Sequence, residues 1–425
     1  MSEKRVIVVG TTADYIETIS TRYPGRSLFI TDPAERGRHP GNAPGAGGEL
    51  LCGLENGGRV MAALKAHLAA RGFEPSGVAC FDCESLMLAS LIARELGLSY
   101  PSPESISLCR SKYATRKRWA EEGVPCPEAA LARTPGEAVD FFERSGGPVV
   151  MKPLSGSGSE LVTLCRDRSE CERAFALLSE RMSAHSNARM YPSAGTGDGT
   201  DPRTAFVVET FVSGAEFSCD FTVDGNDLEI IRVAGKIMAP DQSMGTTLAY
   251  LLPGELPGGM GREDLAPALM KAARALGLGR AIAMVDFIVS EGGINFLEMT
   301  PRPGGDCLPD LIMESSGFDT LGAALDFAEG KKLGIPPAGS WRKLTGLRLI
   351  ARREGILKTI DCGEVASDGR VRSCHLKRGP GDRIVLPPLD YDSRILGHVI
   401  FEPAEGGPRD AGMAEIMAKL RVEYA

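Results

Sequence analysis

Two carboxylates stand in otherwise apolar runs of the sequence, and they are the first candidates for chemistry. Asp286 lies within AIAMVDFIV and Glu298 within INFLEM, and a Gly-rich stretch separates the two runs. A charged group among apolar neighbours is costly to bury unless a partner compensates it. Mg²⁺ is a hard cation that binds carboxylate oxygens, so this pair predicts a magnesium site. An ordinary hairpin with two structurally paired acids is the alternative.

The register of this hairpin decides whether the two acids share a face of the sheet. A three-residue turn at 291–293, with a glycine at a positive-φ position, would pair Ser290 with Ile294 and place Asp286 opposite Glu298. Cross-strand neighbours have Cβ atoms about 5 Å apart, which suits one or two shared metal ions. A two-residue turn would place the acids on opposite faces and exclude a shared site.

A lysine followed by a loop of small residues is the second candidate. In VVMKPLSGSGSELVTL a strand ends at Lys152, a Ser/Gly loop follows, and the chain returns as a strand. Small residues let backbone N–H groups approach phosphate oxygens, and a lysine adds a positive charge. The loop is not a Walker A motif, because no Gly-Lys-Ser/Thr sequence opens a helix, and a flexible hairpin tip is the alternative. The loop comprises Ser155, Gly156, Ser157, Gly158 and Ser159.

The elements that must position these residues begin with a strand–helix alternation over residues 1–105. Short apolar strands such as RVIVV, SLFITD and GVACF alternate with helical patterns such as VMAALKAHLAAR and ESLMLASLIARELG. This alternation predicts a parallel, doubly wound α/β sheet. The turn after the first strand, VGTTADY, lacks G-x-G-x-x-G, so no dinucleotide site is predicted. We interpret the Gly/Pro-rich stretch 38–58 as a surface loop, with a substrate-side loop as the alternative.

Beyond residues 100–103, where two prolines mark a boundary, strands and helices no longer alternate regularly. CRSKYATRKRWAEEGVPCP predicts one basic helix that ends near Gly123. Residues 186–203 are polar and Gly-rich, and we expect them and the 153–160 loop to be mobile without a ligand. After the two prolines at 336–337 the pattern is mainly β and ends in a helix, GMAEIMAKLRVE.

Composition excludes several classes of function. The formal net charge is −8, which argues against a nucleic-acid or anionic-membrane partner. No apolar run approaches the roughly 20 residues that span a bilayer, and MSEKRVIVVG leads into a strand rather than a signal peptide. The 11 cysteines are scattered, which favours reduced thiols and a cytoplasmic protein. Cys80 and Cys83 form a single CxxC without a second pair, and we interpret them as core thiols.

Five segments, in consistent order from about Glu84 to about Phe401, resemble ATP-grasp enzymes. The resemblance is to carboxylate–amine ligases related to L-amino acid ligases and biotin carboxylase. Each segment alone is weak, whereas five in order are specific for the fold and much less so for the substrate. The segments are ESLMLASLIARELGLSYPSPESISLCRSKYATRKRWAEEGVPCP, PVVMKPLSGSGSELV, VVETFVSGAEFS, VDFIV with INFLEMTPRPGGDCLPDLI, and DYDSRILGHVIF.

The resemblance implies an ATP site. Lys112 and Lys152 would hold the ATP phosphates, and the 155–159 loop would be a lid over them. The strand Glu209-Thr210-Phe211-Val212 would contact adenine, mainly through its backbone, and Glu216 would bind the ribose hydroxyls.

The resemblance also implies a metal and phosphoryl-transfer site. Asp286 and Glu298 would hold one or two Mg²⁺ ions, with Mn²⁺ as an alternative, and Arg302 would steady the phosphoryl group during transfer. Lys236 is a further expected member of the site. The family often has E-x-N-x-R where this chain has EMTPR, so Thr300 replaces an asparagine and leaves weaker metal binding open.

The expected architecture is an α/β (α+β) ATP-grasp fold in four parts. The resemblance implies a Rossmann-like domain (1–105), a small lid subdomain (106–208), a larger sheet subdomain (209–335) and a mainly β closing domain (336–425). ATP would lie between the second and third parts.

The implied reaction joins a carboxylate and an amine. ATP would phosphorylate the carboxylate, and the amine would then displace phosphate from the acyl phosphate to form an amide. Both substrates would be small molecules, such as amino acids, entering beside the 302–306 turn. A purine-pathway or carboxylation enzyme of the same fold and a non-catalytic, nucleotide-gated binding protein are the alternatives. The sequence leaves the substrates and a homodimeric state open.

Overall fold

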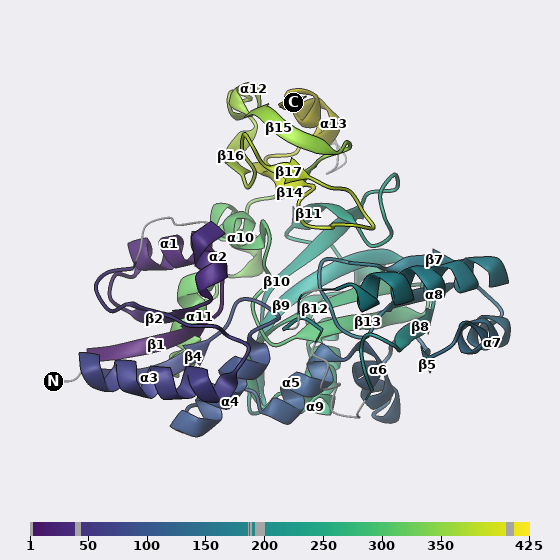
Figure 1. Cartoon of the computed structure of the whole chain (residues 1–425). Coiled ribbons are helices and arrows are strands. Elements are labelled where there is room, and N and C mark those ends of the chain that lie inside the picture. The colour runs from purple at the N-terminus through teal and green to yellow at the C-terminus, as the bar shows by residue number, and fades with distance from the viewer. Residues whose placement is uncertain (1–2, 39–43, 186, 188, 192–199, 405–411) are drawn as a thin grey trace.

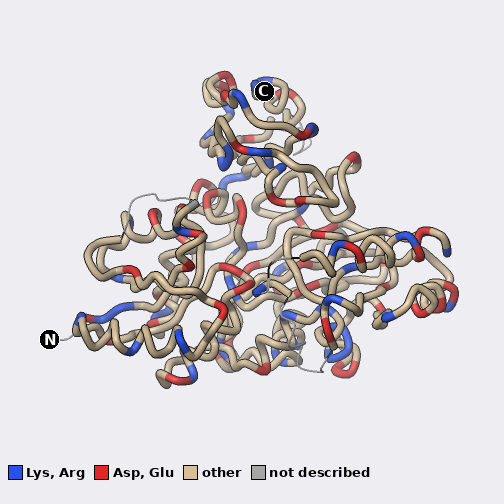
Figure 2. Tube along the Cα trace, in the orientation of Figure 1, with Lys and Arg blue, Asp and Glu red and all other residues tan. Residues whose placement is uncertain are grey.

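The computed structural model describes residues 3–38, 44–185, 187, 189–191, 200–404 and 412–425 of the chain. Within these residues the strands form four sheets, which helices cover and connect (Figure 1). The predicted mixed α/β class is confirmed. Basic and acidic residues are interspersed along the trace rather than separated by sign (Figure 2). None of the helices in the described part of the chain is long and apolar enough to cross a membrane.

A parallel sheet of order β3-β2-β1-β4 forms the N-terminal part, as the strand–helix alternation predicted. One side is covered by α3 (Gly57–Arg71) and α4 (Leu86–Leu96). The other side packs against α1 (Ala13–Arg22) and against α10 (Leu308–Ser316) and α11 (Thr320–Ala328), which come from much later in the chain. This sheet is therefore fixed to the segment that follows the acidic hairpin. Its strands are β1 Glu3–Val9, β2 Ser27–Thr31, β3 Glu49–Leu51 and β4 Phe73–Ala79.

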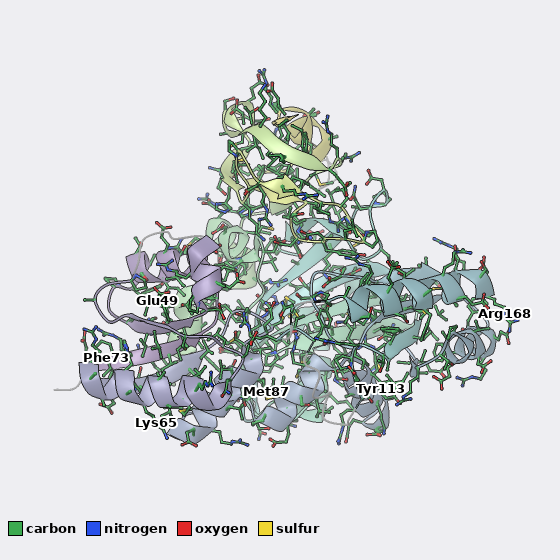
Figure 3. The ribbon with its side chains drawn as sticks, viewed as in Figure 1. Glu49, Lys65, Phe73, Met87, Tyr113 and Arg168 are labelled. Atoms are coloured by element: carbon green, nitrogen blue, oxygen red, sulfur yellow. The ribbon has the colours of Figure 1, made fainter. Side chains whose placement is uncertain are left out.

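The stretch 38–58 contains an edge strand that the sequence did not predict. After α2 (Pro33–Arg38), strand β3 runs parallel to β2 with Glu49 opposite Phe29, and Figure 3 labels Glu49 at this edge. Three residues are too few to show a strand period, which is why the pattern was missed. Residues 39–43 of this stretch lie outside the described residues.

The expected lid subdomain, residues 106–208, contains most of an antiparallel sheet of order β5-β8-β6-β7, whose strands lie between residues 129 and 210. We call this sheet with its helices the lid. Helices α7 (Pro135–Ser145) and α8 (Arg168–Ser183) pack on one face of this sheet. On the other face Tyr113 of α6, labelled in Figure 3, packs with Leu154 and Val207. The strands of the lid are β5 Ala129–Ala132, β6 Val149–Pro153, β7 Thr163–Cys165 and β8 Phe206–Thr210.

The predicted single basic helix is two helices. α5 (Pro103–Arg110) ends at Ser111, and α6 (Lys112–Glu121) begins there, because the Ser111 hydroxyl accepts a hydrogen bond from the Ala114 N–H at 3.2 Å. The break makes Lys112 the first residue of α6. Its side chain is thereby placed beside the lid rather than in the middle of a solvated helix face.

An eight-stranded antiparallel sheet of order β13-β12-β9-β10-β11-β14-β18-β16 lies at the centre of the molecule. Helix α9 (Arg262–Ala275) packs on it, and the short 3₁₀ turns lie at Pro257–Gly259 and Ala338–Ser340. The sheet continues across the expected boundary at 335–336, because Ala249 of β11 pairs with Leu347 of β14. Its strands are β9 Ala215–Asp224, β10 Asp227–Met238, β11 Thr247–Leu252, β12 Arg280–Ser290, β13 Gly293–Thr300, β14 Leu344–Ile350, β16 Val371–Leu376 and β18 Ile395–Phe401.

The C-terminal part is mainly β, as predicted, but its last element differs from the prediction. Helix α13 covers only Met413–Ala418, and Arg421–Tyr424 forms strand β19, which pairs with β15 (Gly355–Asp361). Val422 and Tyr424 alternate with exposed residues and pack into the local core, which explains the strand. The remaining elements are α12 Gly363–Ala366 and β17 Arg383–Ile384.

Candidate functional site

The acidic hairpin β12–β13 places Asp286 directly opposite Glu298, as predicted, but with a different turn and strand register. The turn has two residues, since Ser290 pairs with Gly293 and Val289 with Ile294. The predicted pairing of Ser290 with Ile294 is therefore wrong. The register shifts by one residue between Asp286 and Phe287, where Leu297 is the extra residue of β13. This β-bulge restores the acids to one face, which a two-residue turn alone would have prevented.

Asp286 belongs to a partly buried group of three charged side chains, which we call the Lys236 cluster. The Lys236 ammonium lies 2.9 Å from an oxygen of Glu216 and 2.9 Å from Oδ2 of Asp286. Burial disfavours the charge on Lys236, but the two carboxylates outweigh it and raise the pKa of Lys236 above its usual value. Burial likewise raises the pKa of Asp286, and Lys236 opposes that effect. The cluster holds one more acid than base, so it is suited to a further cation.

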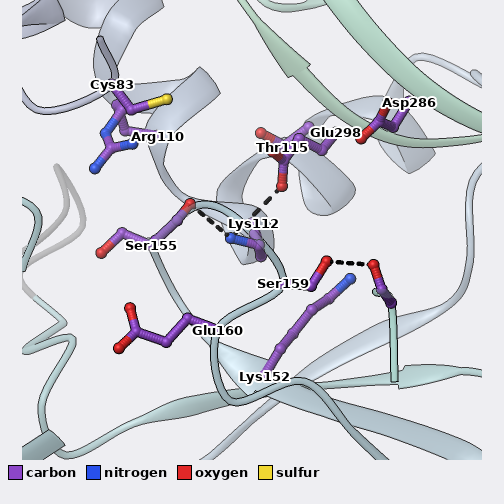
Figure 4. A network of polar contacts seen from close by, with 12 residues as sticks. Cys83, Arg110, Lys112, Thr115, Lys152, Ser155, Ser159, Glu160, Asp286 and Glu298 are labelled. Atoms are coloured by element: carbon purple, nitrogen blue, oxygen red, sulfur yellow. Dashed lines mark hydrogen bonds and ion pairs between the residues drawn. The ribbon is translucent and has the colours of Figure 1, made fainter. Parts of the chain in front are cut away.

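Glu298 faces the lid across a small cavity that Lys112, Gly156 and Thr300 also line. The Lys112 ammonium lies 3.6 Å from Oε2 of Glu298 and donates a hydrogen bond to the Gly156 carbonyl at 3.3 Å (Figure 4). Burial alone would raise the pKa of Glu298, but the surrounding cations hold it below its usual value. Those cations are Lys112, Lys152, Lys236 and Arg116.

Lys152 belongs to a second buried group, which we call the Lys152 cluster. Its ammonium lies 2.6 Å from Oε2 of Glu209, whose other oxygen is 3.2 Å from Nε of Arg116. Burial lowers the pKa of Lys152, and the single carboxylate does not fully compensate. The pKa of Glu209 lies below its usual value because Arg116 and Lys152 together outweigh its burial. This cluster holds one more base than acid, so it is suited to an anion.

The sequence did not single out Arg116, although a signal for it exists. Arg116 follows Lys112 by four residues on α6, and side chains at that spacing lie on the same face of a helix. Arg116 is 2% exposed, so its charge is not part of a solvated helix face.

The Ser/Gly loop is fixed at both ends by hydrogen bonds. The Ser155 hydroxyl donates to the Met190 carbonyl at 3.0 Å. The Ser159 hydroxyl donates to the Gly245 carbonyl at 2.8 Å (Figure 4). Gly156 has φ +118°, and a Cβ there would lie 2.7 Å from the Tyr191 hydroxyl oxygen, so a larger residue would not fit. Ser157 and Gly158, at the tip, are the exposed members of the loop. Of the stretch 186–203, which was expected to be mobile, residues 186, 188 and 192–199 lie outside the described residues.

The segment expected to contact adenine is only partly a strand. β8 ends at Thr210, and Phe211 and Val212 follow it as an irregular segment. Phe211 is 39% exposed, and its N–H donates to the Pro148 carbonyl at 3.0 Å. Phe211 and Val212 therefore lie at the accessible end of the lid sheet, whereas the Glu209 carboxylate is directed to Lys152.

Arg302 lies beside the N-terminal sheet rather than beside a carboxylate. Its Nε and Nη2 approach the Cys83 sulfur at 3.3 and 3.2 Å, and its Nη1 donates to the Pro303 carbonyl at 2.7 Å. Cys80 and Cys83 are both buried, as expected of core thiols. Cys83 nevertheless lines the cavity with Lys112 and Glu298, a placement that the CxxC spacing did not indicate.

The geometry therefore gathers most of the expected residues between the lid and the central sheet. Within the described residues no three His, Cys, Asp or Glu side chains form a ready-made metal site. Asp286 and Glu298 form a pair of carboxylates, and Oδ1 of Asp286 is buried without a hydrogen-bond partner among the described residues. An unpartnered buried oxygen beside a second acid fits a divalent cation.

Comparison with known proteins identifies the fold. Residues 145–310 match the family model described as ATP-grasp domain. The whole chain superposes on the crystal structure of an L-amino acid ligase from Bacillus licheniformis with a TM-score of 0.78 and 19% identity, covering 100% of both chains. The predicted ATP-grasp fold is thus confirmed.

Two relatives share more sequence with this chain. An uncharacterized protein, y4rH, of Sinorhizobium fredii is 29% identical over 333 residues, which are 78% of this chain and 64% of that protein. Human carnosine synthase 1 is 28% identical over 293 residues, which are 66% of this chain and 34% of that protein. The chain thus spans between a third and two thirds of the length of these relatives.

Proposed function

We propose that this chain, whose residues 145–310 belong to the ATP-grasp family, is an ATP-dependent carboxylate–amine ligase. The observation that carries the proposal is a set of three lysines from α6, β6 and β10, whose ammonium groups meet carboxylates between the lid and the central sheet. Lys112 lies 3.6 Å from Glu298, Lys152 2.6 Å from Glu209, and Lys236 2.9 Å from Asp286. Phosphoryl transfer depends mainly on positioning and on neutralising phosphate charge, which such a set supplies. No covalent nucleophile is required.

In this proposal the nucleotide lies between the lid and the central sheet. Lys112 and Lys152 bind the phosphates, with the 155–159 loop above them. Phe211 and Val212 contact adenine, and Glu216 binds the ribose hydroxyls. The excess positive charge of the Lys152 cluster supports the phosphate assignment, because an arriving phosphate would complete its charge balance.

Asp286 and Glu298 would hold one or two Mg²⁺ ions. When bound, magnesium would neutralise part of the phosphate charge. The unpartnered oxygen of Asp286 supports this assignment. Lys236 would keep Asp286 and Glu216 in place, since its ammonium contacts both carboxylates.

The proposed reaction has two balanced steps. The substrate carboxylate attacks the γ-phosphorus of ATP, so a new P–O bond forms, the bond to the β-phosphate oxygen breaks, and ADP leaves. Arg302 stabilises the charge on the transferring group, since its guanidinium is planar and permanently charged. The amine then attacks the acyl carbon, a C–N bond forms, phosphate leaves, and the nitrogen loses a proton.

We propose that both substrates are amino acids or related small molecules. The similarity to an L-amino acid ligase fold and to carnosine synthase supports this class. The substrates would enter beside the 302–306 turn. All 11 cysteines are free thiols, which supports the expected cytoplasmic location.

Coupled assays of ADP release test the proposal. The full chain is incubated with Mg-ATP and a panel of acids, with and without a panel of amines, and products are identified by mass spectrometry. We expect slow ADP release with the right acid alone, faster release with the right amine, and one amide per ADP. Stimulation by bicarbonate would favour the carboxylation alternative. Tight ATP binding without any turnover would favour the non-catalytic alternative.

A further inference from the structure

The loop between β10 and β11, residues 239–246, contacts the Ser/Gly loop directly, because its Gly245 carbonyl accepts the hydrogen bond from the Ser159 hydroxyl at 2.8 Å. Its Gly245 has φ +78°, and a Cβ at this residue would lie 2.8 Å from the Ser159 hydroxyl oxygen. Ser159 itself has φ +60°, a strained value for a residue with a side chain. The hydrogen bond and the close contact with Gly245 thus occur at a residue whose backbone is strained.

The 239–246 loop is in turn fixed by one buried arginine of the C-terminal part. Arg394 donates from Nη1 to Gln242 Oε1 at 3.1 Å and from Nη2 to the hydroxyls of Ser243 at 3.2 Å and Thr246 at 2.9 Å. These three bonds come from three residues of one loop. A single guanidinium thus ties the whole loop together.

Arg394 is a buried arginine that is held by neutral groups. It is 2% exposed, and its guanidinium donates to the Gln242 amide oxygen and to the hydroxyls of Ser243 and Thr246. Burial, with Arg348 nearby, lowers its pKa. A buried charge is costly unless polar groups compensate it. The three hydrogen bonds to the 239–246 loop supply this compensation for the Arg394 guanidinium.

The segment that carries Arg394 also reaches the lid. We call residues 389–394 the strap. The Leu389 carbonyl accepts a hydrogen bond from Arg181 of α8 at 3.2 Å, and Tyr391 packs against the lid core. The Arg394 guanidinium lies 5.5 Å from the centre of the Tyr391 ring. The strap therefore joins the lid helix, the lid core and the 239–246 loop.

We infer that Arg394 is a positioning residue for the Ser/Gly loop, acting through the 239–246 loop and Ser159. The inference rests on the proposed function, since it assigns the C-terminal part a role in setting the loop over the ATP phosphates. Arg394 touches neither nucleotide nor reacting atoms in this arrangement. Its effect reaches the phosphates only through Gly245 and Ser159.

The test compares Arg394→Gln, Arg394→Lys and Ser159→Ala in the full chain. Arg372→Gln is the matched control, because Arg372 is a surface arginine of the same region that pairs with Glu402. We expect Arg394→Gln and Ser159→Ala each to raise KM for ATP about three- to tenfold, the range for one lost hydrogen bond, while KM for the acid and the amine stays unchanged. Arg394→Lys should restore part of the loss.

A double-mutant cycle separates this role from general stabilisation. If Arg394 acts through Ser159, adding Arg394→Gln to Ser159→Ala should change KM for ATP less than twofold. Multiplicative effects would overturn the inference. An unchanged KM for ATP in a folded Arg394→Gln variant would overturn it as well.

Hydrogen exchange without nucleotide keeps the inference testable if no substrate pair is found. The Arg394→Gln and Ser159→Ala variants should exchange faster than the wild type at residues 155–161. The Arg372→Gln control should exchange like the wild type. Equal exchange in all four proteins would overturn the inference, whatever the outcome for the ligase activity. If Arg394→Gln does not fold, the Ser159→Ala variant decides the inference. An unchanged exchange rate at residues 155–161 in that variant would show that Ser159 does not hold the Ser/Gly loop, and the inference would fail.

Discussion

The Lys236 cluster and the Lys152 cluster each consist of three charged side chains around a lysine–carboxylate pair, but their net charges have opposite signs. In each, a lysine from an apolar strand contacts a buried or partly buried carboxylate at hydrogen-bonding distance. Lys236 has two acids and a raised pKa, whereas Lys152 shares one acid with Arg116 and has a lowered pKa. One cluster is left with a negative excess and the other with a positive excess.

In the proposed function, this difference would let neighbouring groups of side chains bind a metal ion and a phosphate side by side. Glu298 lies between the clusters and is influenced by lysines of both. The third charged residue of each cluster decides which ion the cluster attracts. It is a second carboxylate beside Lys236 and an arginine beside Lys152. Changing either cluster, or the residues between them, should therefore affect nucleotide binding and chemistry in distinguishable ways.

The largest effect is expected from Glu298→Gln and Arg302→Met. Each removes a charge that would act on the transferring phosphoryl group, so kcat should fall about a hundredfold or more while ATP still binds measurably. Single-turnover kinetics and calorimetric titration with a non-hydrolysable ATP analogue measure the two quantities. Equal losses in affinity and rate would remove these residues from the chemical step.

The next effect concerns stability and its pH dependence. Glu209→Gln leaves Lys152 and Arg116 buried without an acid, so we expect a loss of about 3 kcal/mol in the free energy of unfolding at pH 7. The folded-state pKa of Glu209 is lowered, so its contribution is present above the unfolded pKa, about 4.3, and is lost as the pH falls through the folded value. Denaturant unfolding of the wild type and the variant between pH 7 and pH 3 checks this. The difference between the two proteins should narrow with acidification, and a constant difference would contradict the assignment.

A smaller loss is expected when the positive excess is removed. Lys152→Met keeps the apolar stem and deletes the ammonium, so affinity for the ATP analogue should fall about tenfold or more, as for one hydrogen bond to a charged group. Lys65→Met on the outer face of α3, labelled in Figure 3, is the control, since its pair with Glu95 is exposed. Unchanged affinity in Lys152→Met would detach the Lys152 cluster from the phosphates.

The sequence predicted the fold more fully than the ion pairs of these clusters. Period and order were sufficient for the parallel sheet, for β6 with its loop, and for the pairing of Asp286 with Glu298. The route to that pairing was missed, because a bulge at Leu297 leaves the same sequence pattern as a longer turn. The partners of Lys152 were missed as well, since Glu209 and Arg116 come from a strand and a helix that local patterns cannot bring together.

The smallest effect is expected at Thr300, the departure from the pattern of related sequences. Thr300 is 5% exposed and lines the cavity with Glu298, so its side chain lies where a carboxamide could reach a metal ion. A carboxamide oxygen is a better ligand for Mg²⁺ than a neutral hydroxyl oxygen, because it carries more negative charge. Thr300→Asn should therefore lower the Mg²⁺ concentration for half-maximal ATP binding by about threefold. Thr300→Val removes the hydroxyl at nearly constant volume and should change it little. If Thr300→Asn instead weakens magnesium binding, the side chain at position 300 does not reach the ion. The acids of the Lys236 cluster and Glu298 would then hold the metal without help from position 300.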